Sequence, residues 1–116
     1  MSSSWFVSRH QGAKEWLERQ GWPVERQVSH LHPAEVSAGD QVYGTLPVHL
    51  AAELCARGAR YYHLILDLPA NVRGRELTAD ELDQYGARLV RFQVINRPGS
   101  LATDQHQFMR QHAGGR

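Results

Sequence analysis

The stretch Trp5-Phe6-Val7-Ser8-Arg9-His10-Gln11-Gly12 decides the fold, because it joins a short apolar run to polar turn residues and then to a helical pattern. In that pattern Ala13, Trp16 and Leu17 fall on one face of a helix, until Gly21 ends it. The sequence therefore predicts a strand that leads directly into an amphipathic helix.

The rest of the chain repeats this alternation. Further strands are predicted over 28–31, 41–43, 61–68 and 90–94, and further helices over 47–57 and 78–86. The last helix begins with the capping-box spacing of Thr78 and Glu81, and Leu77 and Leu82 are placed as a hydrophobic staple. The order βαββαβαβ favours an α/β fold with an open, Rossmann-like, mostly parallel sheet and helices on both faces.

Two of the predicted strands have patterns that indicate their places in the sheet. The strand 61–68 is almost unbroken apolar sequence, so we expect it to be central, together with the strand 5–7. The strand 90–94 alternates apolar and polar residues, which suits an edge of the sheet or a subunit contact.

Length and composition narrow the class of protein. A chain of 116 residues suits one domain, which we expect over 1–95, followed by a polar and mobile tail over 96–116. No apolar run is long enough to span a bilayer, no signal peptide is expected, and the single cysteine cannot form an internal disulfide. These features favour a cytoplasmic protein that has no membrane partner.

Two strand-to-helix turns, Ser8-Arg9-His10-Gln11-Gly12 and Gly44-Thr45-Leu46-Pro47, predict an anion site. The first N–H groups of a helix have no partner within the helix, and the helix dipole adds partial positive charge there. A net charge of +1 is too small to favour a long nucleic acid. We therefore expect a small phosphate-bearing ligand, held where the carboxyl ends of parallel strands meet.

Within these turns, individual side chains suggest roles. Arg9 is the candidate phosphate clamp, His10 a possible proton carrier, and Ser8 a hydrogen-bonding partner. Gly44 permits close backbone approach, and Leu46 and Pro47 complete the second turn. Thr45 either touches the ligand or caps the helix that follows, and capping is the more common role of threonine.

A third polar stretch leaves the carboxyl end of the strand 61–68. It contains Asp67, Arg73, Gly74 and Arg75, which fold over a ligand as a lid or form an ordinary charged surface loop. His30 and His32 point the same way in an extended chain, but nothing in the sequence indicates a third ligand, so no metal site is expected. No nucleotide-binding glycine motif is present and no cofactor is expected.

Other potentially reactive side chains have simpler interpretations. His49 is expected on a helix surface and His63 on a strand, and neither is expected to be catalytic. Cys55 falls on the apolar side of its helix, where packing is favoured over nucleophilic catalysis.

Three segments in order resemble a small family of accessory proteins of type III CRISPR systems. They are Trp5-Phe6-Val7-Ser8-Arg9-His10-Gln11-Gly12-Ala13, then Gly39-Asp40-Gln41-Val42-Tyr43-Gly44-Thr45-Leu46-Pro47-Val48-His49-Leu50-Ala51, then Leu66-Asp67-Leu68-Pro69 with Arg73-Gly74-Arg75-Glu76-Leu77. The similarity spans roughly residues 5–95. Three motifs in register are more specific than any one of them.

The resemblance implies a domain related to the sensors of cyclic oligoadenylate. It also implies a ring nuclease that linearises this messenger and so ends the antiviral response. Such a ring, cyclic tetra-adenylate for example, carries its own nucleophile in the ribose 2′-hydroxyl, so cleavage needs alignment and charge stabilisation but no metal. A four-membered ring has twofold symmetry, which favours a homodimer with the ligand across its axis. The alternative is a non-catalytic module that sequesters the messenger.

Overall fold

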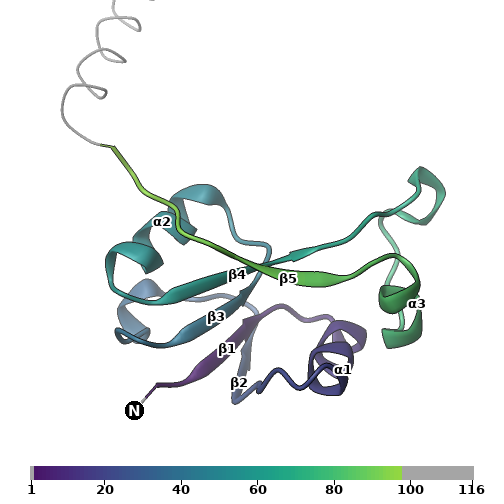
Figure 1. The fold of residues 1–116 in the computed structure, drawn as a ribbon, viewed down its shortest axis with the longest axis horizontal. Coiled ribbons are helices and arrows are strands. Elements are labelled where there is room, and N and C mark those ends of the chain that lie inside the picture. The colour runs from purple at the N-terminus through teal and green to yellow at the C-terminus, as the bar shows by residue number, and fades with distance from the viewer. Residues whose placement is uncertain (1, 98–116) are drawn as a thin grey trace, which may run out of the picture.

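The computed structural model describes residues 2–97, which form a five-stranded mixed sheet with helices packed against it (Figure 1). The order of elements agrees with the sequence prediction. The elements are β1 (Ser4–Val7), α1 (Gln11–Arg19), β2 (Arg26–Val28), η1 (Pro33–Glu35), β3 (Gln41–Gly44), α2 (Val48–Ala56), β4 (Arg60–Ile65), η2 (Ala70–Val72), α3 (Ala79–Gln84) and β5 (Arg88–Phe92). The expected tail over 96–116 lies almost wholly outside the described residues.

The strand order β2-β1-β3-β4-β5 places β3 in the middle, with β1 and β4 on either side of it. The pairs β1–β2, β1–β3 and β3–β4 are parallel, whereas β4–β5 is antiparallel. The sheet is therefore mixed, and its antiparallel strand β5 is at the edge, as the alternating pattern of that segment predicts. Because β1, β3 and β4 are parallel, their carboxyl ends meet at one edge of the sheet.

Two apolar clusters, one on each face of the sheet, form the core. On one face Phe6 and Tyr43 pack with the apolar sides of α1 and α3, including Trp16, Leu17 and Leu82. On the other face Trp5 and Val42 pack with Leu54 of α2 and with Leu31 and Val36 of the segment around η1. Consecutive residues of a strand point to opposite faces, so Trp5 and Phe6, and likewise Val42 and Tyr43, divide between the two clusters.

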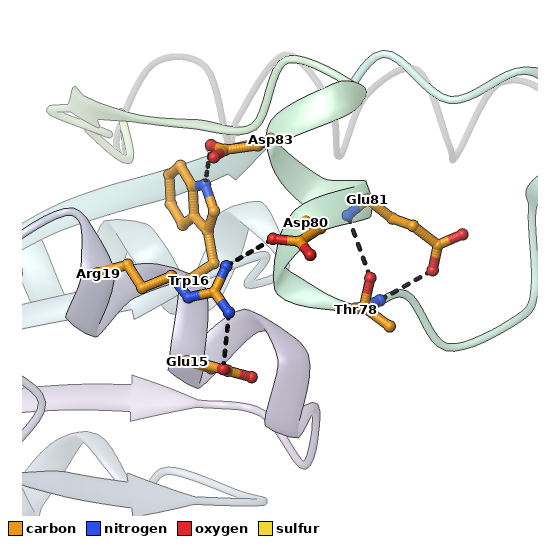
Figure 2. Close-up of polar contacts among 7 residues, drawn as sticks. All are labelled: Glu15, Trp16, Arg19, Thr78, Asp80, Glu81 and Asp83. Carbon is orange, nitrogen blue, oxygen red and sulfur yellow. Dashed lines mark hydrogen bonds and ion pairs between the residues drawn. The ribbon is translucent and has the colours of Figure 1, made fainter.

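Polar contacts join α1 to α3 on the first of these faces (Figure 2). The indole N–H of Trp16 donates to a carboxylate oxygen of Asp83 at 2.8 Å. Arg19 forms ion pairs with Asp80 at 2.7 Å and with Glu15, four residues earlier in its own helix, at 2.9 Å. The exposed ion pairs contribute little to stability, so the buried indole and the apolar contacts around it hold the two helices together.

The start of α3 is as predicted. The Thr78 hydroxyl accepts from the Glu81 N–H at 3.1 Å, and the Glu81 carboxylate accepts from the Thr78 N–H at 3.0 Å, which completes a capping box (Figure 2). Leu77 and Leu82 are both buried in the same apolar cluster, in agreement with the predicted staple.

Several element ends differ from the sequence prediction. The second strand is Arg26–Val28 and not 28–31, and Leu31 instead contributes to the core from a loop. The strand β4 ends at Ile65 because the next residues turn toward α3, where the Asp67 N–H donates to the Tyr85 carbonyl at 2.9 Å. β5 covers Arg88–Phe92, since its register with β4 pairs Ile65 with Arg88 and Tyr61 with Phe92.

Candidate functional site

The two predicted turns line one hollow of about 190 Å³ at the carboxyl ends of β1 and β3. Ser8 and His10 come from the first turn, and Gly44 and Thr45 from the second. The rest of the lining is apolar and comes from β1, α1, β4, the segment after it and α3, namely Phe6, Val7, Ala13, Leu64, Leu66 and Leu82. The hollow is thus apolar inside and polar at its mouth, as is usual for small-ligand sites.

The first turn is held by hydrogen bonds of Ser8. Its backbone N–H donates to the Val28 carbonyl at 2.8 Å, and its carbonyl accepts from the Gln27 side chain at 3.0 Å. Its hydroxyl oxygen accepts from the His10 N–H at 2.9 Å. The hydroxyl proton is left for another acceptor, so Ser8 retains the ability to donate to a ligand.

His10 fastens the start of α1 to the chain that enters α3. It is the N-cap of α1, where its Nδ1 lies 3.0 Å from the Ala13 N, while its Nε2 lies 3.1 Å from the Leu77 N. A neutral imidazole has only one acceptor nitrogen, so the ring accepts from one of these N–H groups at a time. A protonated ring has none, which means that carrying a proton requires His10 to release both contacts.

Gly12 makes the same junction tight. A Cβ atom at this position would collide with the Leu77 carbonyl oxygen and would also come within 3.2 Å of the His10 ring. The residue at this position of α1 must therefore be glycine for the chain before α3 to approach so closely.

The arginines predicted to bind phosphate differ in their surroundings. Arg9 and Arg73 are exposed, and neither side chain makes an ion pair or a hydrogen bond within the described residues. Arg75 instead pairs with Glu81 at 2.6 Å, a contact that raises the pKa of Arg75 and lowers the pKa of Glu81. None of these three arginines is among the described residues that line the hollow. Arg9 is adjacent in sequence to two that do, Ser8 and His10.

Asp67 also has a partner. Its carboxylate accepts at 3.2 Å from Arg88, the first residue of β5, and it is not among the described residues that line the hollow. This part of the predicted lid is thus bonded to the neighbouring strand β5.

The second turn is close-packed against its neighbours. A Cβ at Gly44 would lie 3.2 Å from the Val7 carbonyl oxygen, so the close approach at this glycine is to β1. Thr45 is exposed and does not cap α2, whose N-cap is Pro47 without a side-chain bond. The capping alternative for Thr45 is wrong, because Pro47 separates it from the first turn of the helix. The next residue, Leu46, donates its N–H to the Tyr61 hydroxyl at 2.8 Å.

Sequence reasoning missed a polar pair that supports this second turn from β4. The Tyr61 hydroxyl lies 2.6 Å from His63 Nδ1 and 3.2 Å from the Gly44 carbonyl oxygen. Tyr61 is 2% exposed, and burial raises the pKa of its phenol, although the Leu46 N–H acts in the opposite direction. The available signal was the i, i+2 spacing, which places Tyr61 and His63 on one face of a strand.

His30 and His32 are exposed beside η1, and the structured part of the chain contains no group of three His, Cys, Asp or Glu side chains that could share a metal ion. Nor does any helix within residues 2–97 have the length and apolar character needed to cross a membrane.

Comparison with known proteins identifies the family. The family model described as "Putative CRISPR-associated protein (Cas_VVA1548)" matches residues 5–95. No curated protein and no solved structure matches the chain. The matched range contains every element of the sheet except Ser4 of β1, together with both turns of the hollow. Since the match extends over most of the chain, the protein belongs to this family of CRISPR-associated proteins.

Proposed function

We propose that this protein is a ring nuclease that binds cyclic oligoadenylate and cleaves it to linear products, which switches off type III CRISPR signalling. The observation that carries the proposal is the meeting of two strand-to-helix turns around one hollow. Arg9 lies between Ser8 and His10, which line it, and its side chain has no partner within residues 2–97. The N–H groups of Ser8, His10 and Leu46 already have acceptors. The donors left for a phosphodiester include the Arg9 guanidinium and the Ser8 hydroxyl.

The proposed reaction uses the ligand's own ribose as nucleophile. The 2′-oxygen forms a bond to the adjacent phosphorus, the bond from phosphorus to the 5′-oxygen breaks, and the 2′-hydroxyl proton ends on the 5′-oxygen. The product is a linear chain with a 2′,3′-cyclic phosphate end. Arg9 neutralises the developing phosphorane charge and the Ser8 hydroxyl donates to a phosphate oxygen, so the protein supplies alignment and electrostatic stabilisation.

Two finer features belong to the same proposal. The sheet is of the Rossmann-like kind found in sensors of cyclic oligoadenylate, with the ligand at the carboxyl ends of its parallel strands. The protein acts as a homodimer, because a twofold dimer presents the same site twice to a ring with twofold symmetry.

The decisive experiment incubates an excess of cyclic tetra-adenylate with the protein and a chelator, followed by chromatography of the products. Multiple turnovers to linear products with 2′,3′-cyclic phosphate ends are expected. Recovery of the intact ring after denaturation of the protein would instead indicate a module that only sequesters the messenger. Activity lost to the chelator and restored by zinc would point to a metal mechanism.

Arg9 gives the sharpest test of the site. Arg9→Ala should lower the single-turnover rate by about 10²-fold, the range for loss of one electrostatic stabiliser, and Arg9→Lys should restore little of it. Arg60→Ala is the matched control, since Arg60 is also exposed but lies at the amino end of β4. Cleavage by folded Arg9→Ala at the rate of the unaltered protein would rule out the first turn as the phosphate site.

His10 separates two versions of the mechanism. His10→Ala should lower the rate with a changed pH profile if the ring carries a proton, and should change it little if alignment and charge stabilisation dominate. Thermal stability must be followed in parallel, because His10 also caps α1.

A further inference from the structure

A second hollow, of about 230 Å³, lies on the other face of the sheet, between the start of α2 and the strands β4 and β5. Its walls are the side chains of Leu46, Val48 and Ala51 on one side and the rings of Tyr61, His63 and Phe92 on the other. The lining is almost entirely apolar, and the imidazole of His63 is its main polar group. Leu46 belongs to the same turn, 44–47, that borders the phosphate hollow through Gly44 and Thr45.

The ring of His63 is held in one orientation by Tyr61. The Tyr61 hydroxyl oxygen accepts from the Leu46 N–H at 2.8 Å, so its own proton goes to a second partner. The phenol proton has two possible acceptors, the His63 Nδ1 at 2.6 Å and the Gly44 carbonyl oxygen at 3.2 Å. We assign it to Nδ1, because 2.6 Å is short for a bond donated by an N–H but ordinary for one donated by a hydroxyl. Nδ1 is then an acceptor, which leaves the hydrogen of a neutral ring on Nε2.

The Nε2–H of His63 is available to a ligand. Nε2 has no hydrogen-bond partner among the described residues. Every buried side-chain nitrogen or oxygen in that part of the chain does have a partner, so Nε2 is not buried and solvent reaches it. The Phe92 ring stands edge-on to the imidazole, with centroids 6.1 Å apart, and is 44% exposed. The hollow thus offers one oriented donor beside an accessible aromatic face.

From this geometry we infer that the hollow binds one adenine base, with the His63 Nε2–H donating to a ring nitrogen of the base. Adenine is flat and uncharged, stacks on aromatic side chains, and presents ring nitrogens that accept hydrogen bonds. Pockets for drug-sized ligands measure about 300–1,000 Å³, so a hollow of 230 Å³ suits a single ring system. His63 is therefore a binding residue and Tyr61 a positioning residue.

This inference rests on the proposed function, because it assigns a base of the proposed ligand to a site across the 44–47 turn from the phosphate hollow. A nucleotide that reaches over this turn would place its phosphate at one hollow and its base at the other.

Adenosine, which lacks phosphate, tests the base site separately. In long-range proton–nitrogen NMR of the full chain, His63 should show a protonated Nε2, and added adenosine should shift that signal more than uridine does. His63→Phe should weaken adenosine binding by up to about tenfold, the effect expected for the loss of one hydrogen bond to the ligand. His32→Phe, at an exposed histidine beside η1, is the matched control.

Tyr61→Phe tests the positioning role. It should leave the ring of His63 in place but populate both tautomers, visible in the nitrogen shifts, and weaken adenosine binding by a smaller factor. Tyr43→Phe is the control, because Tyr43 is also buried but belongs to the cluster on the other face of the sheet. An unchanged His63 tautomer in folded Tyr61→Phe would overturn this role.

The outcomes for the base site and for the ring nuclease are separable. Binding of adenosine at His63 without cleavage of cyclic tetra-adenylate would keep the base site and reject the enzyme. Cleavage that depends on Arg9, with equal ring affinity in His63→Phe and no adenosine shift at His63, would keep the enzyme and overturn the base site.

Discussion

At the scale of single residues, Asp40 shows how one buried charge organises the edge of the sheet opposite the candidate site. Its carboxylate accepts from the Ser3 N–H at 2.8 Å, the Ser37 N–H at 3.0 Å and the Trp5 indole at 3.1 Å. Burial opposes the charged form, but these donors and the nearby Arg26 outweigh it, so the pKa of Asp40 lies below its ordinary value. The charged form is thus the one that stabilises the fold.

The lowered pKa of Asp40 predicts how the stability of the fold depends on pH. A carboxyl whose pKa is lower in the folded state stabilises the protein above its unfolded pKa, and this contribution disappears as the pH falls through the folded value. Asp40→Asn should therefore lower the free energy of unfolding at pH 7 by about 1–3 kcal/mol, because an amide cannot accept from all three donors. Urea unfolding of both proteins between pH 7 and pH 3 would measure this.

The difference in free energy of unfolding between the unaltered protein and Asp40→Asn should stay constant down to about pH 5 and become smaller below about pH 4. If this difference did not depend on pH over the whole range, Asp40 would stabilise the fold through packing and not through its charge.

Single residues also mark where prediction from sequence stops. The two-residue period of a strand indicates that His63 shares a face with Tyr61, but not that the Leu46 N–H would also donate to the phenol. That contact depends on how β3 ends beside β4, and Thr45 was misjudged as a possible cap for the same reason. Roles that depend on neighbours distant in sequence need the fold.

At the scale of elements, the junction of α1 with the chain entering α3 depends on the absence of a side chain at Gly12. Gly12→Ala improves helix propensity by up to about 1 kcal/mol, but the new Cβ would collide with the backbone carbonyl of Leu77, which cannot move aside as a side chain could. Overpacking of this kind typically costs about 1–3 kcal/mol. We expect Gly12→Ala to lower the free energy of unfolding, as measured in urea.

The control for this prediction is Gln11→Ala, the preceding and exposed position of α1, which should have little effect or stabilise slightly. If Gly12→Ala stabilised the protein as Gln11→Ala does, the close approach to Leu77 would not be a constraint.

Elements are the level at which the sequence is most informative. Hydrophobic period and caps correctly predicted the order of the β-strands and α-helices, the capping box at Thr78 and the edge position of β5, but not the short helices η1 and η2. The predicted ends of β2, β4 and β5 were wrong, because the end of a strand depends on where its pairing with the neighbouring strand ends. β2 stops at Val28, where its pairing with Val7 of β1 ends, whereas the predicted strand continued to Leu31.

At the scale of the whole molecule, the large apolar side chains that are exposed within residues 2–97 gather at β5, the segment after it and α2. They are Val48 at 71% exposure, Phe92 at 44% and Ile95 at 69%. Val48 and Ile95 line a common hollow of about 440 Å³, and this hollow is the surface we assign to the dimer, whereas Phe92 borders the hollow of His63. An exposed apolar surface beside an edge strand is suited to a second copy of the chain.

The proposed homodimer therefore has a specific test. Light scattering after size-exclusion chromatography should give twice the 13.2 kDa of one chain, and Ile95→Glu should shift the mass toward one chain. Gln20→Glu adds the same charge on exposed surface at the end of α1 and should leave the mass unchanged. A dimer that persists in Ile95→Glu would place the contact elsewhere.

The shared acceptor at His10 has a consequence for backbone amide hydrogen exchange. Only one of its two ring nitrogens carries a lone pair, so the amides of Ala13 and Leu77 cannot both be protected by the ring at once. The tautomer with hydrogen on Nε2 slows exchange at Ala13, and the other slows it at Leu77. A ligand that accepts a hydrogen bond from one ring nitrogen fixes the hydrogen there. It would therefore change the exchange rates of two amides 64 residues apart in opposite directions, a signature that local opening of the turn would not produce.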